Sequence, residues 1–191
     1  MIAWIDLETT GLNTECSIIE VACVVTDDKF NEVGRYESLC MPDPWGAIEG
    51  VAREMHDKSG LWDQAIACDK TFYQVDRELV DVLMYHAAVK KDTAFILGGQ
   101  SVHFDRRFIE RWMPQTNTML AHRQIDVSGL KLMWSMALDI PTEALPPERS
   151  KTTHRAMDDI LASIEAARWY QTYITGENPC QQVWTESLAT A

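Results

Sequence analysis

Residues Met1 to Leu12 read MIAWIDLETTGL, and the interpretation of the whole chain starts from this stretch. Apolar residues with strand-forming character lead into Asp6 and Glu8, and the TTG that follows breaks the pattern as a turn does. Side chains alternate between the faces of a strand, so Asp6 and Glu8 should point the same way. Two carboxylates on one face of a strand end form a binding site for a hard cation such as Mg²⁺ or Mn²⁺. The plainer interpretation is a pair of solvated acids where an edge strand ends.

Length and composition favour one globular domain. The chain has 191 residues, of which 46% are hydrophobic and 24% are charged. We expect a domain over residues 1–174 and a loosely ordered tail over 175–191. No apolar run is long enough to span a membrane and the amino terminus does not read as a secretory signal, so we expect a cytoplasmic protein without membrane contact. The five cysteines are odd in number and never spaced as C-x-x-C, which favours reduced, packed thiols.

The charge of the chain limits the kind of nucleic acid it could bind. The formal net charge is −12 and the pI is about 4.7. A protein that tracks along a long duplex needs a broad basic face, because phosphate neutralisation supplies most of that affinity. Any nucleic acid ligand is therefore expected to be short or single-stranded and to be held locally.

Hydrophobic periodicity predicts an α/β domain. We expect strands over residues 2–8, 17–25, 36–41, 93–97 and 124–127, and helices over 47–57, 61–68, 71–89, 105–113, 128–138 and 154–174. The first three strands should form an antiparallel meander, and Thr71 with Gln74 reads as a capping box. His86, on the apolar face of its helix, is expected to pack in the core. This order of elements favours a mixed sheet with helices packed on it.

The last helix provides a test of the metal interpretation. At 100° per residue its apolar stripe consists of Ala156, Ile160, Ile164, Ala167 and Tyr170. Asp159 lies at the edge of this stripe, whereas Asp158 points towards solvent. A carboxylate at the margin of a core is costly unless something pairs with it, and a metal ion is one such partner.

Two more residues join this pattern. His154 lies where the last helix begins, and histidine titrates in the range needed to activate a water molecule, although a lone histidine there is more often a surface residue. Asp105 starts a helix directly after an apolar strand, where by itself it is an ordinary helix-start acid. Four carboxylates around two divalent ions could clamp a phosphodiester, with one ion activating water and the other stabilising the leaving oxygen.

Three segments together resemble a known family. Residues 5–12 (IDLETTGL), 99–108 (GQSVHFDRRF) and 154–159 (HRAMDD) resemble the three motifs of the DEDD exonuclease superfamily, in its histidine-containing branch, and within it the oligoribonucleases. The resemblance covers about residues 2 to 172. It implies a ribonuclease H-like fold, with a mixed sheet flanked by helices. It also implies 3′ to 5′ hydrolysis of short single-stranded oligoribonucleotides to nucleoside 5′-monophosphates, by a mechanism that uses two ions of Mg²⁺ or Mn²⁺.

The resemblance also implies roles for single residues. It places the ions on the four carboxylates Asp6, Glu8, Asp105 and Asp159, and makes His154 the general base. The implied substrate contacts are Leu12 as a wedge between terminal bases, His56, and the far-phosphate group Ser101, Arg123 and Ser128. The two serines fit helix or turn capping equally well. Family members form homodimers in which one subunit helps to complete the site of the other.

The chain departs from the oligoribonuclease pattern at three positions. Val51 stands where a base-stacking tryptophan is expected, His122 where a tyrosine reaches into the partner's site, and Leu130 where a hydroxyl residue is expected. Because of these departures, the sequence does not fix the length of the substrate. The alternative substrates are single-stranded DNA and a signalling dinucleotide. A non-catalytic nucleotide-binding module is the other alternative. It is disfavoured because none of the four acids or the histidine is missing.

Overall fold

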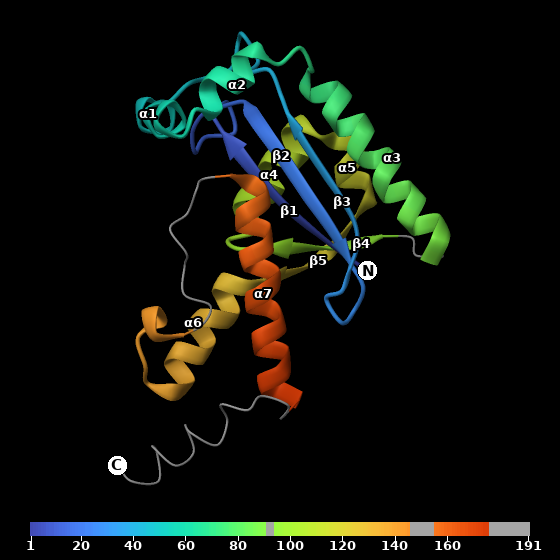
Figure 1. Cartoon of the computed structure of the whole chain (residues 1–191), viewed down its shortest axis with the longest axis vertical. Helices are drawn as coiled ribbons and strands as arrows, with labels where there is room; N and C mark the ends of the chain where they lie inside the picture. Colours follow the sequence, from blue (N-terminus) through green and yellow to red (C-terminus); the bar gives the residue numbers. More distant parts are fainter. Residues whose placement is uncertain (91–93, 146–154, 176–191) are drawn as a thin grey trace.

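The computed structural model describes residues 1–90, 94–145 and 155–175 (Figure 1). In these ranges the strands are β1 (Ile2–Thr9), β2 (Ile18–Thr26), β3 (Glu32–Leu39), β4 (Phe95–Gly99) and β5 (Leu120–Asp126). They form one sheet in the order β3-β2-β1-β4-β5. The β3-β2-β1 half is antiparallel, whereas β1, β4 and β5 are parallel. The predicted meander and mixed sheet are therefore confirmed.

Helices cover both faces of this sheet (Figure 1). They are α1 (Gly50–Ser59), α2 (Leu61–Ala67), α3 (Phe72–Lys90), α4 (His103–Trp112), α5 (Pro114–Met119), α6 (Val127–Leu138) and α7 (Ala156–Thr175), with a short 3₁₀ turn at Thr142–Ala144. One core joins Ala3, Ile5 and Leu7 of β1 to side chains of α3 and α4. The other joins Ile2 and Trp4 of β1 to α7. Because strand side chains alternate, Asp6 and Glu8 continue the face that α7 covers.

The largest differences from the predicted boundaries lie at sheet edges or after a proline. Smaller ones occur at β4, which covers Phe95–Gly99 rather than 93–97, and at α1 and α4, which begin at Gly50 and His103 rather than at 47 and 105. Edge strand β3 begins at Glu32 rather than Tyr36, and edge strand β5 at Leu120 rather than Gln124. The added residues are mostly exposed, so they lack the apolar pattern that marks a buried strand. Helix α5 was not predicted. Pro114 was expected only to stop the preceding helix, but it also begins α5, because proline fits the first turn of a helix.

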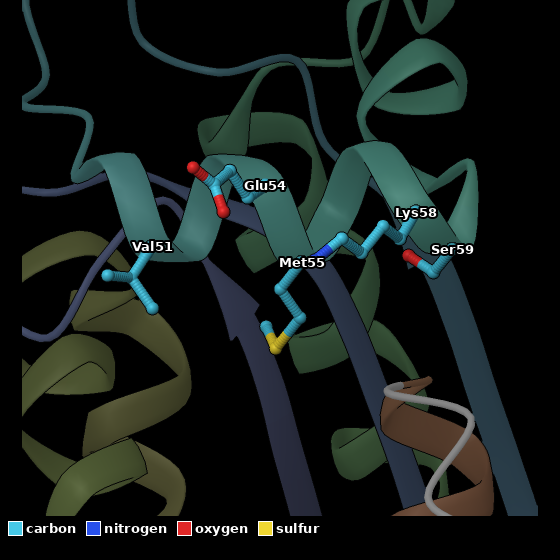
Figure 2. A pocket seen from close by; sticks show the side chains of 5 residues that line it. All are labelled: Val51, Glu54, Met55, Lys58 and Ser59. Carbon is cyan, nitrogen blue, oxygen red and sulfur yellow. The ribbon is translucent and has the colours of Figure 1, made fainter.

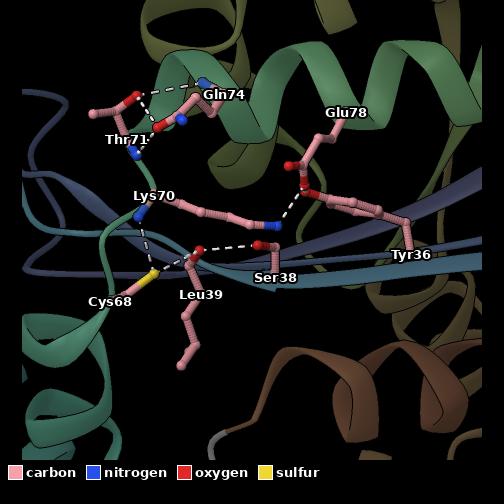
Figure 3. Close-up of polar contacts among 8 residues, drawn as sticks. All are labelled: Tyr36, Ser38, Leu39, Cys68, Lys70, Thr71, Gln74 and Glu78. Atoms are coloured by element: carbon pink, nitrogen blue, oxygen red, sulfur yellow. Dashed lines mark hydrogen bonds and ion pairs between the residues drawn. The ribbon is translucent and has the colours of Figure 1, made fainter.

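Polar contacts attach α3 to edge strand β3 (Figure 3). The predicted capping box is confirmed, since the Thr71 N–H donates to Gln74 Oε1 at 2.8 Å and the Gln74 N–H donates to Thr71 Oγ1 at 3.4 Å. The Glu78 carboxylate accepts hydrogen bonds from Lys70 Nζ at 2.7 Å and from the Tyr36 hydroxyl at 2.9 Å. These contacts fix the start of α3 against the sheet.

His86 packs against a glycine of edge strand β3 rather than in the core, where it was expected. A Cβ atom at Gly34 would lie 2.1 Å from His86 Nε2, so a larger residue on β3 would displace the ring. His86 itself is half-buried.

Two predictions about the whole chain can be compared with the described residues. None of the described helices is long and apolar enough to cross a membrane. The four described cysteines, Cys16, Cys23, Cys40 and Cys68, are free thiols. Helix α7 ends at Thr175, and residues 176–191, predicted to be a tail, lie outside the described residues.

Candidate active site

Carboxylates from the two ends of the sequence meet at the end of β1. Asp6 and Glu8 lie on the face of β1 that α7 covers, and the first turn of α7 carries Asp159. One carboxylate oxygen from each of the three lies within 4.8 Å of the others. Divalent cations bind oxygen at about 2.0 to 2.6 Å, so ligands on opposite sides of one ion lie about 4 to 5 Å apart. Asp158 is exposed, as predicted.

The fourth acid, Asp105, approaches from a different element. It lies buried in the first turn of α4, and its Oδ1 accepts a hydrogen bond from the Leu7 N–H at 3.1 Å. Leu7 is the residue between Asp6 and Glu8. The pairing of β1 with β4 ends at Trp4, so the last part of β1 leaves room for this side chain. We call Asp6, Glu8, Asp105 and Asp159 the acid cluster.

Burial and mutual repulsion disfavour ionisation in the acid cluster. Burial raises the pKa of Glu8 to about 8, and the charges of Glu20 and Asp159 add to this effect. Burial likewise raises the pKa of Asp105 to about 8, although its hydrogen bond from Leu7 opposes the shift. The pKa of Asp6 also lies well above its ordinary range, through burial first and then through the Asp105 and Asp159 charges. Divalent cations would relieve this excess negative charge, and the all-carboxylate donor set fits hard cations such as Mg²⁺ and Mn²⁺.

His56 holds α1 over the end of β1. The side chain is fully buried, and its Nε2 lies 2.8 Å from the Thr9 carbonyl oxygen, to which it donates. The same nitrogen is 4.0 Å from Glu8 Oε2. This placement supports a packing role between helix and strand, and the substrate contact implied for His56 stays a prediction.

Leu12 lies on the loop after β1, which is tethered to the start of α1. Its side chain is exposed, while its N–H donates to Glu49 Oε2 at 3.1 Å. The Asn13 N–H donates to the other oxygen of Glu49 at 3.3 Å. Glu49 directly precedes α1, so one carboxylate joins the loop after β1 to the start of that helix.

The structure brings together two of the three residues predicted to meet a distant phosphate. The Ser101 N–H donates to Ser128 Oγ at 3.1 Å, and the two hydroxyl oxygens are 3.4 Å apart. Asp126, which was not predicted, caps α6 by accepting from the Ser128 N–H at 2.9 Å, and it also accepts from the Ser101 N–H at 3.1 Å. The cap of α6 is thus Asp126 rather than Ser128. Arg123 is exposed on β5 and takes no part in these hydrogen bonds.

A pocket of about 470 Å³ opens beneath α1 (Figure 2). We call it the α1 pocket, and it is lined by Val51, Glu54, Met55, Lys58 and Ser59. In Figure 2 the Met55 side chain extends from the helix over the end of a neighbouring strand, and the Lys58 side chain runs towards Met55. Val51 is 85% exposed, so the position expected to carry an aromatic ring is an open aliphatic surface.

Comparison with known proteins decides the family. The sequence model described as an exonuclease matches residues 3–167, which is most of the chain. The chain belongs to this exonuclease family. It is 32% identical over 177 residues to an oligoribonuclease of Chromobacterium violaceum, covering 88% of this chain and 92% of that protein. It is 33% identical over 178 residues to the human mitochondrial oligoribonuclease, covering 90% of this chain and 72% of the human protein.

Solved exonuclease structures share the fold. Exonuclease I of Escherichia coli in complex with a dT13 oligonucleotide aligns with a TM-score of 0.64 at 18% identity, over 90% of this chain and 41% of that chain. Exonuclease I of Methylocaldum szegediense aligns with a TM-score of 0.65 at 16% identity, over 87% of this chain and 39% of that chain. The chain thus spans about two fifths of these structures. This likeness confirms the predicted ribonuclease H-like fold.

Sequence reasoning missed three residues around the site of this exonuclease-family chain. Glu20 and Asp126 adjoin the acid cluster, and Arg155 lies at the start of α7. Glu20 had a signal, because it is the one charged residue within the apolar run SIIEVACVV. Asp126 also had one, because an aspartate directly before a helix is a common cap. His154, the predicted general base, lies outside the described residues.

Proposed function

We propose that this exonuclease-family chain removes nucleotides from the 3′ end of short single-stranded oligoribonucleotides and releases nucleoside 5′-monophosphates. The observation that carries this proposal is the meeting of Asp6, Glu8 and Asp159 within 4.8 Å. The hydrogen bond of Asp105 to the backbone between Asp6 and Glu8 adds the fourth acid. Relatives named oligoribonuclease match the chain over most of their own length.

In this proposal the acid cluster holds two divalent ions, Mg²⁺ or Mn²⁺. Bound ions would supply Lewis acidity towards the phosphodiester and the attacking water. The four carboxylates come from β1, α4 and α7, so the chain brings them together only when the sheet and both helices are in place. His154 would accept a proton from the attacking water, which requires its imidazole to be neutral.

Substrate would lie between the acid cluster and the residues around it. Leu12 is exposed on the loop after β1, and the α1 pocket offers the apolar side chains of Val51 and Met55. The paired hydroxyl groups of Ser101 and Ser128, with Arg123, would meet the far phosphate of a short strand. The net charge of −12 supports a short substrate, because the chain has no excess of basic residues to follow a long one.

We also propose that the protein is a homodimer in which α6 contributes to the interface. Leu132, Met133 and Met136 of α6 are exposed and lie within one turn of each other. Helix α6 directly follows β5, which is an edge strand of the sheet. Sedimentation of the wild type and of Met136→Lys tests this, with a dimer expected for the first and a shift towards monomer for the second. A monomeric wild type at micromolar concentration contradicts it.

We place the exonuclease domain at residues 1–174 and the protein in the cytoplasm, where the free thiols of the described cysteines would stay reduced. Expression in the native host with fractionation and thiol labelling tests the location. A protein recovered outside the cytoplasm, or with oxidised cysteines, contradicts this part of the proposal.

End-labelled RNA and DNA oligomers of two to about twenty nucleotides test the activity, a range that brackets short and long modes of strand binding. The wild type should shorten RNA from its 3′ end in Mg²⁺ or Mn²⁺ and stop in excess chelator. Asp6→Asn should be inactive, and Asp63→Asn, an exposed acid on α2, should be active. If the enzyme prefers DNA or a signalling dinucleotide, that molecule replaces short RNA as the proposed substrate. Nucleotide binding without cleavage would identify a non-catalytic module.

A further inference from the structure

A fifth carboxylate lies beside the acid cluster without belonging to it. Glu20 lies directly opposite Glu8 in the pairing of β1 with β2, and Glu20 is fully buried. Since opposite residues in a sheet share a face, Glu20 also points towards α7. A buried carboxylate needs partners, because an unpaired buried charge is strongly unfavourable.

Both oxygens of Glu20 are bound to the start of α7. Oε1 accepts hydrogen bonds from Arg155 Nε at 2.8 Å and from Arg155 Nη2 at 2.6 Å. Oε2 accepts from the Ala156 N–H at 3.0 Å. Glu20 is not among the carboxylates whose oxygens lie within 4.8 Å of one another, and both of its oxygens accept hydrogen bonds from the start of α7. Its contacts are therefore those of a residue that holds the helix.

The sequence of α7 explains why a strand residue must supply this contact. The residue before the helix is Arg155, and an arginine side chain has donors only, so it cannot cap the first N–H groups of its own helix. Glu20 takes the place of that cap across the sheet. Its negative charge also lies at the positive end of the helix dipole, where it is favourable.

This contact fixes the turn that carries the metal ligand. The N–H groups of Asp158 and Asp159 donate to the Arg155 carbonyl oxygen at 3.1 and 3.2 Å. Asp159 therefore lies one turn from the residue that Glu20 holds, and His154 is the neighbour of Arg155 in the sequence. Glu20 and Arg155 are 135 positions apart, so the contact joins the two ends of the domain.

We propose that Glu20 and Arg155 are positioning residues that set the distance between Asp159 and the β1 carboxylates, and so set the affinity of the site for divalent ions. This inference rests on the proposed metal-dependent function. The hydrogen bonds of Glu20 are to Arg155 and to the backbone of Ala156, so the proposed effect on the ions acts through the position of α7. Removing a partner that hydrogen-bonds a metal ligand directly commonly changes metal affinity by about 10- to 100-fold. Glu20 acts one helical turn from Asp159, so we expect an effect at the lower end of that range.

Mn²⁺ binding, followed by electron paramagnetic resonance without substrate, tests the proposal. Glu20→Gln removes one acceptor and the charge, and Arg155→Lys keeps the charge but removes the two-nitrogen contact. We expect both variants to raise the dissociation constant for Mn²⁺, with Glu20→Gln weakening binding roughly tenfold. In nuclease assays kcat at limiting metal should fall and recover at high metal, while KM for the oligonucleotide stays within about twofold.

The matched control is Ile164→Val, which removes one methyl group from the buried face of α7, away from Glu20. A purely structural role predicts that Ile164→Val and Glu20→Gln lower the melting temperature and weaken Mn²⁺ binding in parallel. Wild-type Mn²⁺ affinity in a folded Glu20→Gln or Arg155→Lys variant, or equal weakening by Ile164→Val, overturns the proposal. If Glu20→Gln does not fold, Arg155→Lys decides. A wild type that binds Mn²⁺ but cleaves nothing refutes the nuclease function and leaves this test valid.

Discussion

The acid cluster and the α1 pocket lie near the same strand end but are built in opposite ways. In the acid cluster Glu8 and Asp105 are buried, and Asp105 is fixed by a backbone hydrogen bond. In the α1 pocket Val51 and Lys58 are exposed on one side of a short helix. Groups that must meet an ion within tenths of an ångström need rigid support, whereas an exposed helix face can change without disturbing the core. We therefore expect changes in the acid cluster to affect kcat strongly and changes in the α1 pocket to affect KM weakly.

The largest expected effect on kcat distinguishes the two neighbouring aspartates Asp158 and Asp159. Asp159→Asn should lower kcat roughly a thousandfold, since a lost metal ligand removes about 4 kcal/mol of transition-state stabilisation. Asp158→Asn, the matched control, should stay within about twofold because its side chain is exposed. Single-turnover hydrolysis of a labelled oligoribonucleotide measures both. Equal activity of the two variants would remove α7 from the metal site.

The second prediction concerns stability without metal. Glu8 and Asp105 have native pKa values of about 8, above those of the unfolded chain, so the folded state binds more protons between about pH 4.5 and 8. The stabilisation that comes from protonated Glu8 and Asp105 is fully present below this pH range and is lost as the pH rises through it. In chelator, the midpoint of thermal unfolding should fall from pH 5 to pH 8.5, and Mg²⁺ should restore it.

Glu8→Gln is the control for this pH dependence. The variant should be more stable than the wild type at pH 8.5 in chelator by about 1 to 3 kcal/mol, or roughly 3 to 10 °C. It should show a flatter pH profile and a smaller gain from Mg²⁺. If the stability of the wild type instead rises with pH over the same range, repulsion among the carboxylates of the acid cluster does not destabilise the folded protein.

The same contrast explains how much of the molecule the sequence could predict. Strands β1 and β2 are buried on both faces, and their apolar runs gave boundaries within one residue. Edge strands β3 and β5 have exposed ends without such a pattern, so their starts were missed. Burial on two faces constrains every residue of a strand, whereas an edge position accepts many residue types.

The acids were predictable, but their supports were not. Strand alternation placed Asp6 with Glu8, and helical periodicity separated Asp159 from Asp158. The contact of Glu20 with Arg155 depends on how β2 and α7 pack, and no local period encodes a partner 135 residues away. The burial of His56 depends in the same way on which side of α1 faces β1. Local patterns therefore identified the residues for the chemistry, and tertiary packing decided what holds them.

A smaller effect should come from restoring an aromatic ring in the α1 pocket. Val51→Trp should lower KM for a dinucleotide about fivefold, since stacking of a base on an aromatic side chain is worth about 1 to 3 kcal/mol. Val51 is 85% exposed, so the larger side chain needs no rearrangement of the core. Val89→Trp, an exposed change on α3, is the control and should leave KM unchanged. A KM that does not respond to Val51→Trp would mean that bases do not reach this part of α1.

The smallest effect concerns Lys58, the positively charged side chain of the α1 pocket. It is best measured through the salt dependence of the reaction. If Lys58 contacts one phosphate of a single strand, Lys58→Gln should raise KM roughly two- to fivefold, as expected for an exposed charge pair. The dependence of log(kcat/KM) on log[salt] should become shallower by about 0.7, because one fewer counterion is released. Lys29→Gln, in the loop between β2 and β3, changes the net charge equally and should leave both quantities unchanged. Equal changes in the two variants would mean that Lys58 acts through overall charge. The α1 pocket would then contribute shape to substrate binding without a specific phosphate contact.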